Sequence, residues 1–495
     1  MLPSITNRRW NEGTAAHLLN RAGFGGSPAE VARLVELGPE GAVESLLDVP
    51  AAPSGRQPTL PAGLEADPGR VERLRQMRDA TPDQRTALRR AELMEQRRRI
   101  QDLRLWWLGR MISGRQPLED KLVLFWHGHF ATSVRKVRDA VSMARQWETL
   151  RRHASGSWKQ LLLAMTRDPA MLIWLDQAQS RREHPNENFA RELLELFSLG
   201  EGHYTERDVT EAARSLTGLS LDRARHEFVW RPAVHDDGPK EFLGATGRWG
   251  PEDIIERIVA HPESSPFIVD KLWRFFAEES PEPEVLQALT TVFRESGHEF
   301  RPMLRVMFLS EAFYTPRRMR SQIKSPVQWL VMAVRQLERR TPQSEAVLAV
   351  LRDLGQELFA PPNVKGWDGG VAWINTATLA RRMQLSAVLV KGRAGLPEMV
   401  GGARGEQMRM RWRRRSGTGG ATTGSVEVDR LFEAEDRKSR ERLVAALAER
   451  FLQSPFRSVL EERVREALGD DEPPAPGAIL NAIQTILAST DYQLV

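Results

Sequence analysis

The 495-residue chain contains no cysteine. This absence excludes disulfide bonds, thiolate nucleophiles, cysteine-ligated zinc and iron–sulfur clusters. It does not fix the compartment, because exported proteins can also lack cysteine. No run approaches the ~20 apolar residues that a membrane span requires, so we expect no span. The first residues lack the apolar core and small-residue cleavage site of a secretory signal, which predicts a cytoplasmic protein.

A large charge excess of either sign is also absent. The net charge is +5, from 71 basic and 66 acidic residues. Much of the excess lies at 89–104 and 409–417, and no aromatic residue is regularly interleaved with these arginines. A nucleic-acid partner is therefore the weakest of the functional interpretations.

Strand signals are few, whereas helix signals recur along the chain. Ser27-Pro28 with Glu30 is a capping box ahead of a helical pattern that Gly38 should end. The best strand is 226–230, which could form half of a small hairpin. We predict a mainly α protein: a large multi-helix globular body with at most a small β-hairpin and an irregular Trp/Gly-rich loop.

Composition also predicts the domain organisation. Residues 1–400 should form the main helical domain, with a charged helical insertion near 67–112. Residues 401–428 lack periodicity and are rich in Gly and Arg, which predicts a flexible loop. Residues 429–495 resume helical patterning and should pack back on the main body.

The first polar cluster lies in NENFARELLELFSLGEGHY, residues 186–204. A helix would place Asn188, Glu192 and Glu195 on one face, which could be a site. Alternatively the face is solvated, with Arg191 forming i,i+4 ion pairs with Glu187 and Glu195.

The second cluster is LFWHGHFATS, residues 124–133. His127 and His129 could share a metal ion if the backbone is extended or the helix ends there. In a regular helix their side chains would diverge by about 160°. The alternative is one histidine that caps carbonyls and one that is exposed.

Two loops complete the set of polar clusters. VHDDGPKEFLG, residues 234–244, places His235, Asp236 and Lys240 together, either as a functional loop or as a simple turn. The Gly-rich loop at 360–382 presents Trp367 and Trp373, which could line a ligand pocket or fill the core. This loop has no phosphate-binding spacing, and the H-E-x-x-H and G-x-S-x-G motifs are absent from the chain.

These clusters, in this order, resemble the large bacterial proteins catalogued as domain of unknown function 1800. The resemblance covers nearly the whole chain and is carried by HLLNRAGFGGSP (17–28), FWHGHFATS (125–133), DPAMLIWLD (168–176), PNENFARELLELFSLGEGHYTERDVTEAARSLTG (185–218), HDDGPKEFLG (235–244), HPESSPFIVDKL (261–272), KSP (324–326) and PPNVKGWDGGVAWINTATLARR (361–382). It implies a helical fold and no particular activity. It also implies a possible partner, because genes of the family often adjoin those of an exported phosphatase- or sulfatase-like family.

The chain departs from the family pattern in three respects. Many members are exported, whereas this sequence shows no signal. Gly128 stands where Asn is common, and Phe197 where His is common. If that His was a ligand or base, the role is vacant here. The pattern of His, Asp, Glu and Asn within apolar helices nevertheless implies that the clusters converge on one pocket.

Our first hypothesis is a metal-dependent, hydrolytic enzyme. His127, His129 and His235 would bind a divalent metal, Glu192 or Asp236 would add a carboxylate ligand, and Glu195 would act as general base.

In that pocket Asn188, Arg191, Lys240, Trp367 and Trp373 would contribute to binding, and Asn188, Glu192 and Glu195 should face inward. The second hypothesis is a non-catalytic assembly or carrier protein that works with the phosphatase/sulfatase-like partner. In that case the polar clusters would be buried networks that fix helix packing.

Overall fold

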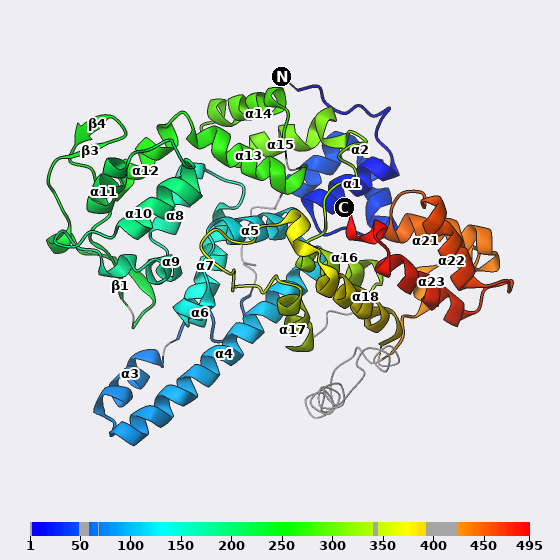
Figure 1. The fold of residues 1–495 in the computed structure, drawn as a ribbon, viewed down its shortest axis with the longest axis horizontal. Coiled ribbons are helices and arrows are strands. Elements are labelled where there is room, and N and C mark those ends of the chain that lie inside the picture. Colours follow the sequence, from blue (N-terminus) through cyan, green and yellow to red (C-terminus); the bar gives the residue numbers. More distant parts are fainter. Residues whose placement is uncertain are drawn as a thin grey trace.

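The computed structural model describes residues 2–48, 59–67, 69–222, 224–278, 280–339, 345–392 and 424–495. The protein is mainly α, which confirms the predicted fold class (Figure 1). The α-helices are α1 Glu12–Ala22, α2 Pro28–Leu47, α3 Arg70–Asp79, α4 Pro82–Ser113, α5 Pro117–His129, α6 Val134–Val137, α7 Ala140–His153, α8 Trp158–Thr166, α9 Pro169–Trp174, α10 Glu187–Glu192, α11 Glu206–Ser215, α12 Pro251–Ala260, α13 Ser264–Phe276, α14 Pro283–Glu295, α15 Phe300–Leu309, α16 Pro326–Gln336, α17 Glu345–Asp353, α18 Thr376–Lys391, α20 Val428–Leu431, α21 Arg440–Phe451, α22 Ser458–Leu468 and α23 Pro476–Ala488. A π-helix spans Leu193–Ser198, and 3₁₀ turns lie at Gln177–Gln179, Pro232–Val234, Glu311–Tyr314, Gly370–Trp373, Asp436–Lys438 and Asp491–Gln493.

Two antiparallel hairpins interrupt the helices, rather than the single one predicted. β1 (Leu219–Asp222) pairs with β2 (Glu227–Trp230), so the predicted strand at 226–230 is confirmed. β3 (Lys240–Phe242) pairs with β4 (Ala245–Gly247). The second hairpin turns at Leu243-Gly244, where both residues have positive φ (44° and 74°). Such turns usually carry Asn-Gly or Asp-Gly, so a hairpin at Leu-Gly is hard to predict from its residues.

Local capping signals position the helix ends. Ser27 Oγ accepts from the Glu30 amide, and the Glu30 carboxylate accepts from the Ser27 amide at 2.7 Å, so α2 begins with the predicted capping box. Gly38 ends the first of the two helical segments that make up α2, as predicted. Its backbone is not helical (φ 68°, ψ 172°), and a second segment continues from Pro39 to Leu47.

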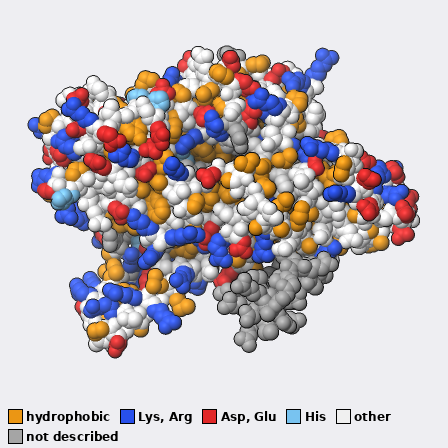
Figure 2. Space-filling model, viewed as in Figure 1, with side chains coloured by type: hydrophobic (Ala, Val, Ile, Leu, Met, Phe, Trp, Pro, Cys, Tyr) orange, Lys and Arg blue, Asp and Glu red, His pale blue; other side chains and the backbone are white. Residues whose placement is uncertain are grey.

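The charged segment near 67–112 forms a helical hairpin of α3 and α4. Its tip projects from the body, and Figure 2 shows Lys and Arg side chains on this projection. The C-terminal part of α4 is different, because Leu103, Trp107 and Met111 are buried in the core. The hairpin is thus anchored at one end and solvated at the other.

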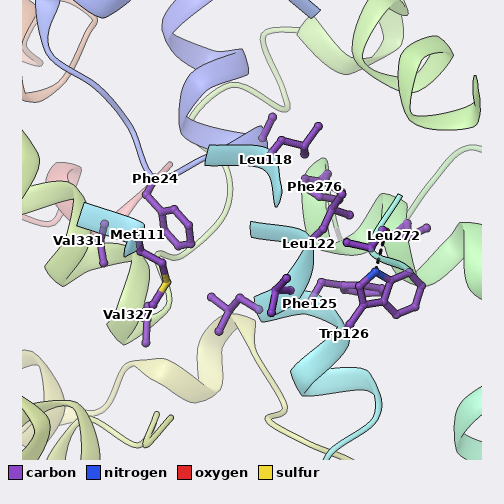
Figure 3. Packing of buried hydrophobic residues seen from close by; sticks show 14 of the residues in the cluster. Phe24, Met111, Leu118, Leu122, Phe125, Trp126, Leu272, Phe276, Val327 and Val331 are labelled. Atoms are coloured by element: carbon purple, nitrogen blue, oxygen red, sulfur yellow. Dashed lines mark hydrogen bonds between the residues drawn. The ribbon is translucent and has the colours of Figure 1, made fainter. Parts of the chain in front are cut away.

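Helix α5 runs through the centre of the molecule and is buried along most of its length. Figure 3 shows Leu118, Leu122, Phe125 and Trp126 among buried side chains from several other segments. The indole N–H of Trp126 donates to the Ala154 carbonyl over 2.8 Å. The C-terminal end of α5 is therefore held firmly, and it carries the two predicted metal-binding histidines.

The C-terminal helices pack against the body through α18 and α23. The chain end is tied to the segment before α16, because the Val495 amide donates to the Gln322 carbonyl at 2.8 Å. Most of the predicted flexible loop at 401–428 lies outside the described residues; of its described part, Val426 and Val428 are buried. In the described part of the chain, no helix has the length and apolarity needed to cross a bilayer.

Candidate functional site

His127 lies in the last turn of α5 and is only 2% exposed. The Phe359 amide donates to its Nε2 over 3.0 Å. Its ring lies 5.2 Å from the Phe359 ring and 5.6 Å from the Trp367 ring, measured between centroids. Burial, reinforced by the charge of Arg104, lowers the pKa of His127 to about 3. The ring is therefore a neutral hydrogen-bond acceptor whose Nε2 is already occupied.

His129 is also buried, and it points to different neighbours. Its Nε2 lies 3.0 Å from the Phe197 carbonyl, which can only accept, so Nε2 carries a proton. Its Nδ1 is buried and has no hydrogen-bond partner among the described residues. Burial, and then the charge of Lys271, lower the pKa of His129 well below its ordinary value. Because α5 stays helical through His129, the two histidines do not form the predicted His-x-His pair.

The loop with His235, Asp236 and Lys240 is a network of internal bonds. His235 Nδ1 lies 2.8 Å from the Thr217 carbonyl. Arg214 donates to both Asp236 carboxylate oxygens, at 2.8 and 3.2 Å, and holds the pKa of Asp236 below its ordinary value. The Lys240 ammonium donates to the carbonyls of Asp236, Gly238 and Trp249.

The predicted metal ligands do not come together. The loop with His235 lies beside α11 and β3, at the edge of the molecule, whereas His127 and His129 lie at its centre (Figure 1). Across the described ranges, no group of three His, Asp or Glu side chains is arranged to hold a metal ion. The sequence pattern identified polar motifs, but it could not distinguish ligands from residues that bond to distant backbone.

The helix at 186–198 is half solvated, which corrects its predicted orientation. Asn188 is exposed, and Glu192 and Glu195 are half-buried. The apolar side of the helix is buried instead, and the polar side follows the surface. Arg191 does not pair with Glu187 or Glu195; both of its terminal nitrogens donate to Glu206, at 2.7 Å each.

Glu192 and Glu195 flank the start of the π-helix Leu193–Ser198. Burial and the charge of Glu195 raise the pKa of Glu192, while Lys365 acts in the opposite direction. Tyr204 donates to Glu195 Oε2 over 3.1 Å. Burial and this hydrogen bond raise the pKa of Tyr204 to about 12. Sequence reasoning missed Tyr204 and Lys365, although both lie inside motifs that carry the family resemblance.

The Trp/Gly-rich loop anchors itself on the end of α5. Trp367 is half-buried over His127, whereas Trp373 is buried. A Cβ on Gly366 would lie 2.2 Å from the carbonyl oxygen of Gly128, so only glycine allows this approach. Trp367 packs against the ring of His127, and the loop brings Lys365 toward Glu192.

Three of the four clusters therefore meet around the end of α5. His129 contacts the π-helix through Phe197, His127 contacts the loop through Trp367, and Lys365 faces Glu192 electrostatically. The exposed part of this region combines two carboxylates, a phenol, an ammonium and an indole. These groups could bind a polar ligand or perform acid–base chemistry.

No curated protein and no solved structure matches the chain. A family model described as "Protein of unknown function (DUF1800)" matches residues 17–494. The match spans the three clusters at the end of α5 and the separate loop at His235, and so the chain belongs to this family.

Proposed function

We propose that this protein is a non-catalytic helical assembly or carrier protein that works with a phosphatase- or sulfatase-like partner. One observation carries the proposal: Nε2 of both motif histidines is engaged by backbone, at Phe359 and Phe197. A metal ion at either atom would have to displace a buried hydrogen bond. Buried polar networks of this kind specify how helices pack.

The His235 loop supports the same interpretation. Asp236 is held by Arg214, and Lys240 is held by three carbonyls. Both side chains stabilise the connection between the two hairpins, and neither presents a free group for chemistry. The partner is inferred from the family resemblance, and nucleic acid is not expected to bind.

Copurification tests the proposal directly. The full chain is coexpressed with a phosphatase- or sulfatase-like protein whose gene adjoins its own in the genome, with a tag on one of them, and the two are separated by size exclusion. A stable complex of defined stoichiometry is expected. If the two proteins elute separately when both are present at micromolar concentrations, the proposed partnership is contradicted. Fractionation of cells then tests the proposed cytoplasmic location.

Hydrolysis is the second candidate function, and the Glu192–Glu195 pair favours it. The raised pKa of Glu192 next to a second carboxylate is a pattern that suits an acid and a base acting together. Among the predicted acids, these two remain open to a substrate or to a divalent metal.

Glu192→Gln, with Glu187→Gln as an exposed control, separates the two candidates. An enzyme should lose activity toward a panel of phosphate, sulfate and carboxylate esters in the first variant alone, with unchanged melting temperature. Metal analysis of protein purified without chelator tests the metal-dependent version. If both variants retain the complex and no ester is hydrolysed, the assembly function is favoured.

A further inference from the structure

The helical hairpin of α3 and α4 presents a surface that its own chain leaves uncovered. Helix α3 buries none of its side chains and is held to α4 by ion pairs such as Arg73 with Glu92. A helix this short is marginal in water by itself. Of the nine large hydrophobic side chains that are exposed among the described residues, four lie in this hairpin: Val71, Leu74, Leu93 and Met94. Such a concentration is typical of a surface that contacts another protein.

One face of α4 combines two of these apolar side chains with arginines. Arg90, Leu93, Met94 and Arg97 follow one another at i, i+3, i+4 and i+7, so they share a face. This face points away from α3, because the residue that pairs with α3 is Glu92, about 200° around the helix from Arg90. Arg90 and Arg97 are exposed and form no ion pair with any described residue.

The hairpin and the C-terminal helices carry opposite charge. Residues 70–99 contain ten arginines and five acidic residues, which gives a net charge of +5. Residues 424–495, which contain helices α20 to α23, have fourteen acidic and nine basic residues, which gives −5. Charge is therefore separated between two parts of the molecule, and such separation favours the association of unlike surfaces.

Helix α22 has an exposed face with the opposite charge pattern. Val459 is 62% exposed, and Glu462 and Glu466 follow it at i+3 and i+7. Both glutamates are exposed and form no ion pair with the residues that the structure describes. Arg463 shares this face, and the exposed Asp471 adds a carboxylate just beyond the helix. The face thus combines an apolar side chain with unpaired acids.

These two faces cannot meet within one molecule. Figure 1 shows the tip of the hairpin and α22 at opposite ends of the protein, and Figure 2 shows acidic side chains at the end that α22 occupies. Pairing of two α4 faces is disfavoured by charge. A two-fold contact centred between Leu93 and Met94 would place Arg90 against Arg97 of the second copy.

We propose that the α4 face formed by Arg90, Leu93, Met94 and Arg97 docks on α22 of a second copy of this chain. The apolar side chains of the two faces pack together, and the arginines pair with Glu462 and Glu466. A contact between unlike surfaces either closes into a ring or extends into a chain of molecules. This self-association does not depend on either proposed function.

Sedimentation velocity of the full chain tests the proposal. At low ionic strength the average mass of the wild type should rise with concentration above the 56.1 kDa of one chain. High salt should reduce the association, because it screens exposed charges.

Two double variants remove the charges of one face each. Arg90→Gln with Arg97→Gln, and Glu462→Gln with Glu466→Gln, should each weaken the association about tenfold or more. Their melting temperatures should match that of the wild type, because all four side chains are exposed. The matched control is Arg8→Gln with Arg33→Gln, which removes two exposed arginines that also lack an ion pair among the described residues. This control should associate like the wild type.

Mixing the two double variants tests the pairing of the faces. One variant keeps only the α22 face and the other only the α4 face, so the mixture should form a 1:1 dimer at a concentration where each variant alone is monomeric. The proposal is overturned if the wild type stays monomeric at low ionic strength, if the double variants associate as tightly as the wild type, or if the mixture stays monomeric. Binding of duplex DNA through Arg90 and Arg97, without self-association, would also overturn it and would assign the α4 face to nucleic acid.

Discussion

The backbone amide of Phe359 donates to Nε2 of His127 over 3.0 Å, joining the end of α5 to the segment that leads into the Trp/Gly-rich loop. The bond is buried, so its loss leaves an unsatisfied amide. His127→Leu should lower the free energy of unfolding by about 1–3 kcal/mol more than His127→Gln, which keeps an acceptor. Urea denaturation of both variants measures the difference. Equal losses would show that packing against Phe359 and Trp367, rather than the hydrogen bond, sets the stability.

The contact between Gly366 and Gly128 predicts a second effect. Gly366→Ala suffers both a left-handed φ of 86° and a Cβ placed 2.2 Å from the Gly128 oxygen. Gly202→Ala suffers only the first, because no atom lies within 4 Å of its Cβ and its φ is 84°. Gly202→Ala should lower the free energy of unfolding by about 1–2 kcal/mol, and Gly366→Ala should lower it clearly more. Thermal denaturation compares them, and equal melting temperatures would contradict the close approach.

The buried carboxyl group of Asp168 should make the stability of the protein depend on pH. It caps α9 by accepting from the Met171 amide at 2.8 Å, and burial raises its pKa to about 7. The folded-state pKa lies above that of the unfolded chain, so the folded protein binds this proton more tightly. The protonated carboxyl group therefore stabilises the fold below pH 4, and this stabilisation is lost as the pH rises toward 7. Asp168→Asn keeps an acceptor for the cap, so it should gain on the order of 2 kcal/mol over the wild type at pH 8 and little at pH 4.

Urea titrations at both pH values test this expectation. Asp139→Asn is the opposite case, because the partners of Asp139 lower its pKa, and it should lose stability at pH 8. If Asp168→Asn and the wild type differ equally at the two pH values, the carboxyl group does not change protonation there.

The buried Lys121 should have the opposite effect, so that its contribution to stability improves as the pH rises. Burial lowers its pKa to about 7, and its ammonium lies 5.0 Å from the centroid of the Phe24 ring. Between pH 10.5 and 7 the unfolded chain binds more protons, so the wild type loses stability as the pH falls through this range. Lys121→Met should be more stable than the wild type at pH 7, and the advantage should shrink by pH 9. Lys159→Met, at an exposed position, should show no such trend.

The parts of the fold that depend on near neighbours in sequence were predictable. The capping box at Ser27 and the strand at 226–230 depend on a few adjacent residues, and both are present. Gly38 shows the limit: the glycine ends one helical segment as predicted, but the second segment that begins at Pro39 was not predicted.

The site was predictable only in part, for a physical reason. The partners of His127 and His129 are Phe359 and Phe197, which only the folded chain brings near. The exposed face of Asn188 depends on which side of the helix the core covers. Neither His226 nor Asp139 lies in a motif with recognisable spacing, so their buried contact, 2.9 Å between His226 Nδ1 and the Asp139 carboxylate, could be found only in three dimensions.

The π-helix Leu193–Ser198 is equivalent to an α-helix with one residue inserted, and this sets how length changes act on the chain. Deleting Leu193 or Leu194, between the two glutamates, would restore regular α-helical winding and turn the preceding helix by about 100° relative to the rest of the segment. If that later segment kept its place, Glu192 would swing away from Glu195 while the carbonyl of Phe197 stayed beside His129. A single-residue deletion could thus separate the acidic pair from its surroundings without changing the side chain of either glutamate.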